Sequence, residues 1–211
     1  IDHRYLSLFP NTVSLQISYE TEINLDRPLT DPAICLSGIE NCTRLKRLTI
    51  NTNRGVRCLR GIEYCEFLES FIIATTFLVR CPEVLDISPL SELSHLTMLE
   101  INKGIKVETD GLDLSGCRNL KHLSLRPNGR TLEFLKGNCL SYLDISESRV
   151  DSLDFLRVEC LQTLKIRETE VESLEVLKVN CLVTLVISWS KVKSIEGSDT
   201  SSLRTIEAEG C

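Results

Sequence analysis

The residues with the greatest chemical potential in this 211-residue chain are its ten cysteines. Cysteine could form disulfides, bind zinc or act as a nucleophile. Cys139, Cys160 and Cys181 follow one another at intervals of 21 residues. Two further sets recur at equivalent positions: Cys42, Cys65 and Cys117, and Cys35 and Cys58. Because a residue type that follows a repeat is most simply a small apolar packing residue, we expect these cysteines to fill a core.

Disulfides between equivalent cysteines remain an alternative, because stacked coils place equivalent Cα atoms within bridging range. Three cysteines in a row would leave one outside any bridge, and terminal cysteine-rich caps are missing. We therefore expect reduced thiols and an intracellular protein, cytoplasmic or nuclear, with an extracellular one as the alternative. The sequon Asn41-Cys42-Thr43 supports that alternative. The repeat also explains the spacing of Cys35 from Cys42 and of Cys58 from Cys65, so we expect no metal site.

Catalytic motifs are not evident. The three histidines, His3, His95 and His122, do not accompany a nucleophile in a known motif, and there is no phosphate-binding loop or nucleophile elbow. We expect the chain not to be an enzyme and to use no cofactor.

Composition restricts the remaining functions. The net charge of -6 argues against sequence-independent nucleic-acid binding, which needs a basic surface. No apolar run reaches the roughly 20 residues of a membrane span. With 42% apolar residues but only 5% aromatic ones, the core must be built from Leu, Ile and Val.

Internal repetition explains that bias. Residues 36–50 (LSGIENCTRLKRLTI) recur 23 residues later at 59–73 (LRGIEYCEFLESFII). Three more units begin at Cys139, Cys160 and Cys181 and share the frame Leu-x-x-Leu-x-Ile. With a first strand at 13–17 and degraded units elsewhere, the chain has about nine units, with longer coils near 20–35 and 74–95.

The frame predicts a solenoid. Leu143-x-Ile145 has the two-residue period of a strand with one buried face, and a 21-residue coil leaves little room for a helix. Stacked coils would bury the aliphatic face that one coil cannot bury alone. The expected core positions in four of the units are Leu45, Leu48, Ile50, Leu140, Leu143, Ile145, Leu161, Leu164, Ile166, Leu182, Leu185 and Ile187.

The frame resembles the leucine-rich-repeat family, in its short class of about 21–23 residues. Gly-Ile-Glu at 38–40 and 61–63 and Asp-Ile-Ser-Pro-Leu at 86–90 resemble units of internalins and of the leucine-rich regulatory subunit of type-1 protein phosphatase. The resemblance implies a β-dominated α/β-type solenoid, a curved horseshoe with one parallel sheet of about nine strands on its concave face and 3₁₀ or extended turns on its convex face. The family's asparagine ladder falls at Asn53 and Asn128, with Ser148, Thr169 and Ser190 replacing it later.

A single domain is expected over 1–211, with irregular longer repeats in 1–117 and regular 20–21-residue repeats in 118–211. The last unit, near Leu203, shows no polar capping segment. Solenoid ends normally have one, so we expect this end to be covered by further residues or by another subunit.

Strand residues that point away from the core predict the binding surface. Trp189, the only tryptophan, stands where other repeats have Glu147 and Glu168. Interface energy concentrates in Trp, Tyr and Arg. The candidate partner-binding residues are therefore Trp189, Arg167, Tyr142, Arg126, Lys165, Glu168, Glu147 and His122.

These features predict a non-catalytic scaffold that binds another protein on its concave strand face. An extracellular recognition or adhesion protein and the targeting arm of a larger enzyme are the alternatives. Thiol titration would separate the first two, because several disulfides would favour an extracellular protein.

Overall fold

The computed structural model describes residues 8–19, 34–36, 38–52, 56–75, 84–156, 159–175, 177, 181–193, 195 and 201–210. Residues 20–33 and 76–83, within the longer coils expected near 20–35 and 74–95, lie outside the described residues, as does the ladder position Asn53.

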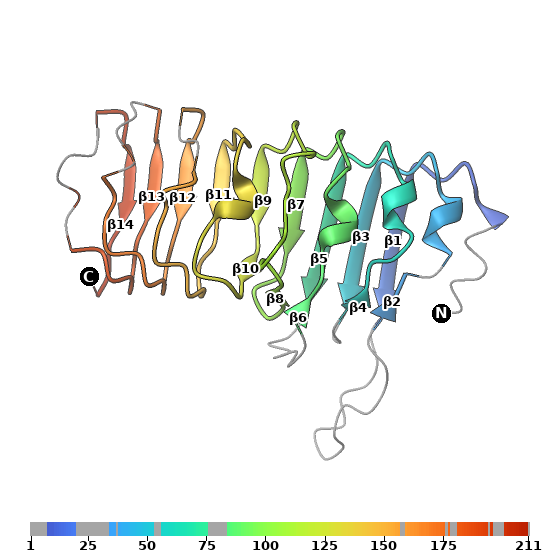
Figure 1. The fold of residues 1–211 in the computed structure, drawn as a ribbon, viewed down its shortest axis with the longest axis horizontal. Coiled ribbons are helices and arrows are strands. Elements are labelled where there is room, and N and C mark those ends of the chain that lie inside the picture. The colour runs from blue at the N-terminus through green and yellow to red at the C-terminus, as the bar shows by residue number, and fades with distance from the viewer. Residues whose placement is uncertain are drawn as a thin grey trace, which may run out of the picture.

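One parallel sheet of nine strands runs the length of the molecule (Figure 1). Its strands are, in spatial order, β1 (Ser14–Tyr19), β3 (Arg47–Thr52), β5 (Ser70–Thr75), β7 (Met98–Ile101), β9 (His122–Ser124), β11 (Tyr142–Asp144), β12 (Thr163–Lys165), β13 (Thr184–Val186) and β14 (Thr205–Glu207). Spatial order equals chain order, because each coil adds one strand beside the previous one. The expected solenoid with about nine strands is confirmed.

The hydrophobic frame sets the register of the strands. Leu143 aligns with Leu123 on one side and with Leu164 on the other, and Leu164 aligns with Leu185. A slip of one residue would turn every leucine out of the core, so the alternating pattern fixes this pairing. The twelve core positions named from the sequence are all buried, with exposed fractions of 5% or less.

The other side of the coils holds short 3₁₀ turns and two small sheets. The turns are η2 (Ile39–Asn41), η3 (Ile62–Tyr64), η4 (Ser88–Leu90) and η5 (Glu133–Leu135). The first small sheet pairs β2 (Ile34–Cys35) with β4 (Val56–Cys58), and the second has the order β10 (Arg126–Pro127), β8 (Lys106–Val107), β6 (Val84–Leu85). The turns were expected, but the small sheets were not. They occur in the part of the chain with longer coils, where more chain is available to run extended beside its neighbour.

Local chemistry explains the Gly-Ile-Glu units that precede η2 and η3. Gly38 and Gly61 have φ values of 95° and 96°, a conformation that glycine adopts without a steric penalty. Each glycine N–H donates to the carboxylate two residues later, Gly38 to Glu40 at 2.8 Å and Gly61 to Glu63 at 2.7 Å. The motif is thus a self-contained turn that starts a 3₁₀ helix.

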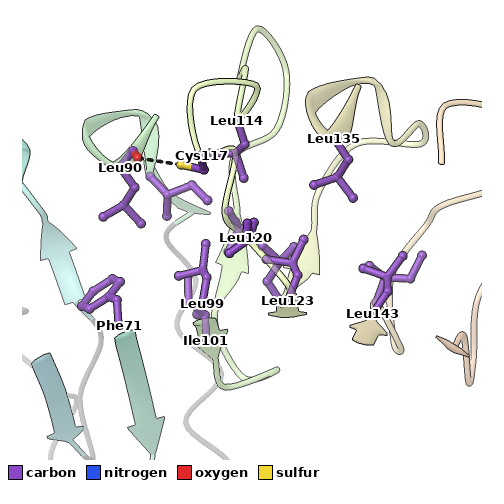
Figure 2. Close-up of a cluster of buried hydrophobic side chains, with 14 of the residues drawn as sticks. Phe71, Leu90, Leu99, Ile101, Leu114, Cys117, Leu120, Leu123, Leu135 and Leu143 are labelled. Atoms are coloured by element: carbon purple, nitrogen blue, oxygen red, sulfur yellow. Dashed lines mark hydrogen bonds between the residues drawn. The ribbon is translucent and has the colours of Figure 1, made fainter. Parts of the chain in front are cut away.

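The coils share one continuous aliphatic core, part of which Figure 2 shows. Cys42, Cys65 and Cys117 are completely buried in it, as expected for packing residues. Each of two thiols also donates to a carbonyl of the preceding coil, Cys65 to Ile39 and Cys117 to Leu90. Burial raises the pKa of Cys65 to about 12 and that of Cys117 to about 11, so both remain protonated donors at neutral pH.

The regular cysteine set differs from the expected core role. Cys139 and Cys160 form a disulfide with a Cα–Cα distance of 5.9 Å. Cys160 is exposed, and Cys139 and Cys181 are half-buried. These cysteines lie three residues before their strands, at the rim of the coil, and they therefore do not fill the core.

Hydroxyls replace asparagine in the later coils, as the sequence indicated. Ser148, Thr169 and Ser190 are buried, with exposed fractions of 7%, 4% and 8%. Thr169 donates its hydroxyl proton to the carbonyl of Ile166 at 2.8 Å. Thr169 thus bonds within its own coil, whereas Asn128 joins two coils. Its Oδ1 accepts the N–H of Thr109, in the preceding coil, at 3.0 Å.

Candidate functional site

The face of the nine-stranded sheet that points away from the core, called the open face below, carries two rows of side chains. Consecutive strands pair in register, so side chains at equivalent positions lie side by side along the sheet. The first row is Ser14, Arg47, Ser70, Met98, His122, Tyr142, Thr163, Thr184 and Thr205. The second row is Gln16, Thr49, Ile72, Glu100, Ser124, Asp144, Lys165, Val186 and Glu207.

An aromatic pair occupies the middle of the first row. The rings of His122 and Tyr142 are stacked, with centroids 4.0 Å apart and planes 6° apart. Lys165 Nζ lies 5.4 Å from the Tyr142 ring centroid, within the range of a cation–π interaction. All three side chains are half-buried, so each keeps surface available for contact.

A buried carboxylate lies beside this pair. Asp144 is only 6% exposed, and its Oδ1 accepts hydrogen bonds from Lys103 Nζ at 2.7 Å and from the Ser146 hydroxyl at 2.7 Å. Lys103 follows β7, so its side chain crosses β9 to reach β11. We call His122, Tyr142, Lys165, Lys103 and Asp144 the central cluster.

Two further charges border the central cluster. Arg126 Nη1 donates to the carbonyl oxygen of Lys103 at 3.3 Å and lies 4.0 Å from Glu147 Oε2. Arg126 is half-buried and Glu147 is exposed. The guanidinium therefore holds the segment that carries Lys103 in place over the sheet.

Burial governs the protonation of His122. Its pKa is lowered from the ordinary value of 6.5, chiefly because burial penalises the imidazolium, and Lys165 acts in the same direction. Glu100 and Asp144 oppose the shift but do not reverse it. His122 is therefore a neutral ring at pH 7, which suits stacking on Tyr142.

A second group of residues lies beyond the C-terminal ends of the later strands. Glu147, Glu168 and Trp189 have φ values of 60°, 53° and 61°, and Gly210 continues the series at 68°. The N–H groups of the first three join consecutive coils: Glu147 donates to the carbonyl of Arg167, Glu168 to that of Ser188 and Trp189 to that of Glu209. We call these four positions the left-handed ladder.

Trp189 is 61% exposed, although its ring rests on the next coil. A Cβ atom placed on Gly210 would lie 2.5 Å from Trp189 Cε3, so the ring covers the glycine backbone. Arg167 points toward the same end of the molecule, where it pairs with Glu207 at 3.1 Å. The indole thus has one supported side and one side open to solvent.

The structure divides the eight candidate residues into two groups. The first consists of His122, Tyr142, Lys165, Arg126 and Glu147, in or beside the central cluster. The second consists of Glu168, Trp189 and Arg167, on or next to the left-handed ladder.

The candidate list lacked Lys103 and Asp144. Asp144 has the alternation of an outward strand residue, which indicated its face but not its burial. The crossing of Lys103 over β9 has no signal in the repeat frame, because no other unit repeats it.

The other described parts of the chain contain weaker candidates for a functional site. Within them, no group of three or more His, Cys, Asp or Glu side chains could hold a metal ion. A depression of about 690 Å³ lies beside η5, lined partly by Asp110, Asp113 and Glu133. Hydrogen bonds from Ser115 lower the pKa of Asp113, so this carboxylate caps a turn as an anion.

No helix in the described residues is both long and apolar enough to cross a membrane.

Comparison with solved structures identifies the fold. Internalin InlF from Listeria monocytogenes superposes with a TM-score of 0.60 at 19% identity, over 97% of this chain and 63% of the internalin. Internalin C2 from the same organism gives 0.51 at 20% identity, over 82% and 83% of the two chains. The leucine-rich-repeat domain of the type III effector XopL gives 0.53 at 14% identity, over 98% and 80%.

The chain thus has the fold of the leucine-rich-repeat proteins, as its repeat frame indicated. It spans 63% of the length of the InlF chain. No protein-family model and no curated protein sequence matches it.

Proposed function

We propose that this chain is a non-catalytic scaffold that binds another protein on the open face of its sheet, centred on the central cluster. The observation that supports this most is the stacked pair of His122 and Tyr142 with Lys165 above the Tyr142 ring. Aromatic side chains that are already stacked on a rigid sheet lose little conformational freedom when a partner packs against them.

The charges around the pair support binding in preference to catalysis. Asp144 is occupied by Lys103 and Ser146, and Arg126 by the Lys103 carbonyl and Glu147. These groups hold one another in a fixed arrangement. Binding needs such an arrangement, whereas a catalytic group must be able to exchange a proton or attack a substrate.

Trp189, Arg167 and Glu168 extend the proposed surface toward β14. Trp189 has the exposed area of an interface anchor, and Gly210 supports its ring from below. Arg167 and Glu207 form an exposed ion pair that a partner could exchange for contacts of its own.

The disulfide favours an extracellular version of the same function. Disulfides persist in oxidising compartments and are rare in the cytosol, so the Cys139–Cys160 bridge supports a recognition protein outside the cytoplasm. Thiol titration of protein purified from its source under denaturing, alkylating conditions tests this. Eight alkylated cysteines of the ten would support the extracellular setting, and ten would support the intracellular one.

The binding surface itself is tested by a matched pair of substitutions. Lys165→Ala removes a lysine from the central cluster, and Lys193→Ala removes an exposed lysine that pairs with Glu172 outside the strands. Immobilised wild-type protein would capture partners from an extract of the source organism, and mass spectrometry would identify them. We expect Lys165→Ala and Tyr142→Ala to weaken capture of one protein at least tenfold, the equivalent of about 1.4 kcal/mol.

Lys193→Ala should bind like wild type. A partner that both open-face variants retain, while circular dichroism shows them folded, would exclude the central cluster as the binding surface.

A further inference from the structure

Three cysteines form a column along one rim of the molecule. Cys139, Cys160 and Cys181 each precede their strand, β11, β12 or β13, by three residues. Tyr142 pairs with Thr163 and Thr163 with Thr184, so the three cysteines occupy consecutive rungs of the same ladder. Figure 1 shows the three strands next to one another.

Cys160, in the middle, has a neighbour on both sides. Its disulfide joins it to Cys139 across a Cα–Cα distance of 5.9 Å, and Cys181 keeps its thiol. The Cys181 thiol donates to a carbonyl oxygen at 3.3 Å, that of Leu161, the residue directly after Cys160. The remaining sulfur thus lies one coil from the bridge, on the side opposite Cys139.

We propose that Cys139, Cys160 and Cys181 form a thiol–disulfide exchange site in which the bridge moves between the two coil pairs. The Cys181 thiol loses its proton to water, and the thiolate attacks Cys160 Sγ. The new Cys160–Cys181 bond forms as the Cys139–Cys160 bond breaks, and Cys139 Sγ leaves with the bonding electrons and takes up a proton. The step is an isomerisation that needs no oxidant or reductant.

The column favours this step geometrically. Attack on a disulfide sulfur passes through a nearly linear arrangement of three sulfurs, with the leaving sulfur opposite the attacking one. Successive coils of a solenoid provide that order, because Cys139 and Cys181 lie on opposite sides of Cys160. At the departing end, Lys121 Nζ donates to the carbonyl of Cys139 at 3.1 Å and brings a positive charge to the rung where a thiolate would form.

Accessibility separates this column from the buried cysteine set. Cys160 is exposed, and Cys139 and Cys181 are half-buried, so water can accept and return the proton. Cys65 and Cys117, in contrast, are completely enclosed in the core. Exchange within the column would change which coils are covalently joined: those of β11 and β12, or those of β12 and β13.

Slow alkylation of the native protein tests the proposal. Oxidised wild-type protein is incubated at pH 8 with a low concentration of iodoacetamide, digested without reduction, and mapped by mass spectrometry. We expect two species, one with Cys181 labelled and the Cys139–Cys160 bridge, the other with Cys139 labelled and the Cys160–Cys181 bridge. Label confined to Cys181 throughout the reaction, or no bridge between Cys139 and Cys160 at the start, would overturn the proposal.

Two serine variants control the experiment. Cys181→Ser removes the attacking thiol, so it should keep the original bridge and give no label on Cys139. The glutathione redox buffer is chosen so that Cys181→Ser forms its Cys139–Cys160 bridge. In the same buffer, Cys139→Ser should form the Cys160–Cys181 bridge. A Cys139→Ser protein that is folded by circular dichroism but keeps both thiols in that buffer contradicts the proposal.

Discussion

His122 shows how one residue can have its chemistry set by position on a repeat. It stands in the first row of the open face, where most other coils carry Ser or Thr, and it stacks on Tyr142 in the next coil. Burial keeps its imidazole neutral. The same residue on an open surface would titrate close to its ordinary value.

This environment makes the stability of the fold depend on pH through His122. Its pKa is lower in the folded than in the unfolded chain, so the unfolded chain takes up the proton first as the pH falls. The stabilisation is complete above about pH 6.5 and is lost as the pH falls through the lower, folded-state pKa. Urea unfolding of wild type and His122→Gln between pH 8 and 5 measures this: the stability advantage of wild type should shrink as the pH falls. An advantage that grows on acidification would show that the folded state raises this pKa.

The strand register gives a second prediction at this scale. Leu164 is completely buried, whereas its neighbour Lys165 lies on the open face of the sheet. Leu164→Ala should lower the free energy of unfolding by about 2–5 kcal/mol, because it leaves a cavity in the core. Lys165→Ala should cost no more than about 1 kcal/mol, the size of a partly exposed cation–π interaction. Equal losses in urea melts would contradict the register.

The sequence predicts the positions of some side chains well and the contacts of others not at all. Leu143 and Leu164 were predictable, because alternation specifies which face of a strand a residue occupies. The bridge between Cys139 and Cys160 was not, because the repeat shows that the two residues are equivalent but not that they lie at an exposed rim. The contact from Lys103 to Asp144 skips one strand and depends on a loop conformation that no period encodes.

The turns after the later strands repeat the same backbone conformation from coil to coil. At Glu147, Glu168 and Trp189 the left-handed conformation turns the chain out of the sheet, and the N–H bonds to the next coil. A non-glycine residue in this conformation is strained. The strain recurs at each coil because the inter-coil hydrogen bond fixes the backbone there.

Substitution at Glu168 separates the backbone requirement from the side chain. Proline cannot reach φ near +53° and has no N–H to donate to Ser188, so Glu168→Pro should cost about 3 kcal/mol or more. Glu168→Gly permits the same turn and should change stability by no more than about 1 kcal/mol. Thermal or urea unfolding compares the two variants. A mild effect of proline would mean that the turn does not hold neighbouring coils together.

Elements were predictable where the sequence repeats and less so where it does not. The strands and the 3₁₀ turns follow from the aliphatic frame and from the Gly-Ile-Glu units. The sheets β2–β4 and β6–β8–β10 were missed, because each strand contributes only two or three residues and none has an alternating pattern. Their pairing depends on how neighbouring coils of unequal length stack.

At the scale of the whole molecule, each coil is stabilised by its two neighbours. Buried side chains extend without a break from Ile17 to Val192, but Ile206 in β14 is 50% exposed although it aligns with the buried Leu185. In a stack of this kind stability is close to a sum over adjacent coils. Protection should therefore be highest in the middle of the sheet and lowest at β14.

Two matched truncations test this gradient. Leu123→Ala, in β9, where the aligned leucines on both sides are buried, should cost about 2–5 kcal/mol, while Leu185→Ala, beside the exposed β14, should cost less. Hydrogen exchange measured by mass spectrometry should show faster exchange around β13 and β14 than around β9 in wild type. A uniform exchange rate along the sheet would indicate one cooperative unit in place of the expected gradient.

The small sheets behind the N-terminal half have a mechanical consequence. There, consecutive coils are joined along two lines, by the main sheet in front and by β2–β4 or β6–β8–β10 behind. In the later coils the described backbone contacts behind the sheet are isolated hydrogen bonds, such as Lys193 N–H to the Glu172 carbonyl at 3.2 Å. Exposed ion pairs such as Lys193 with Glu172 add to them. Pulled along its long axis, the molecule would behave as a spring of graded stiffness. Its coils would peel from the C-terminal side, and the Cys139–Cys160 bond would hold the coils of β11 and β12 together within the compliant half.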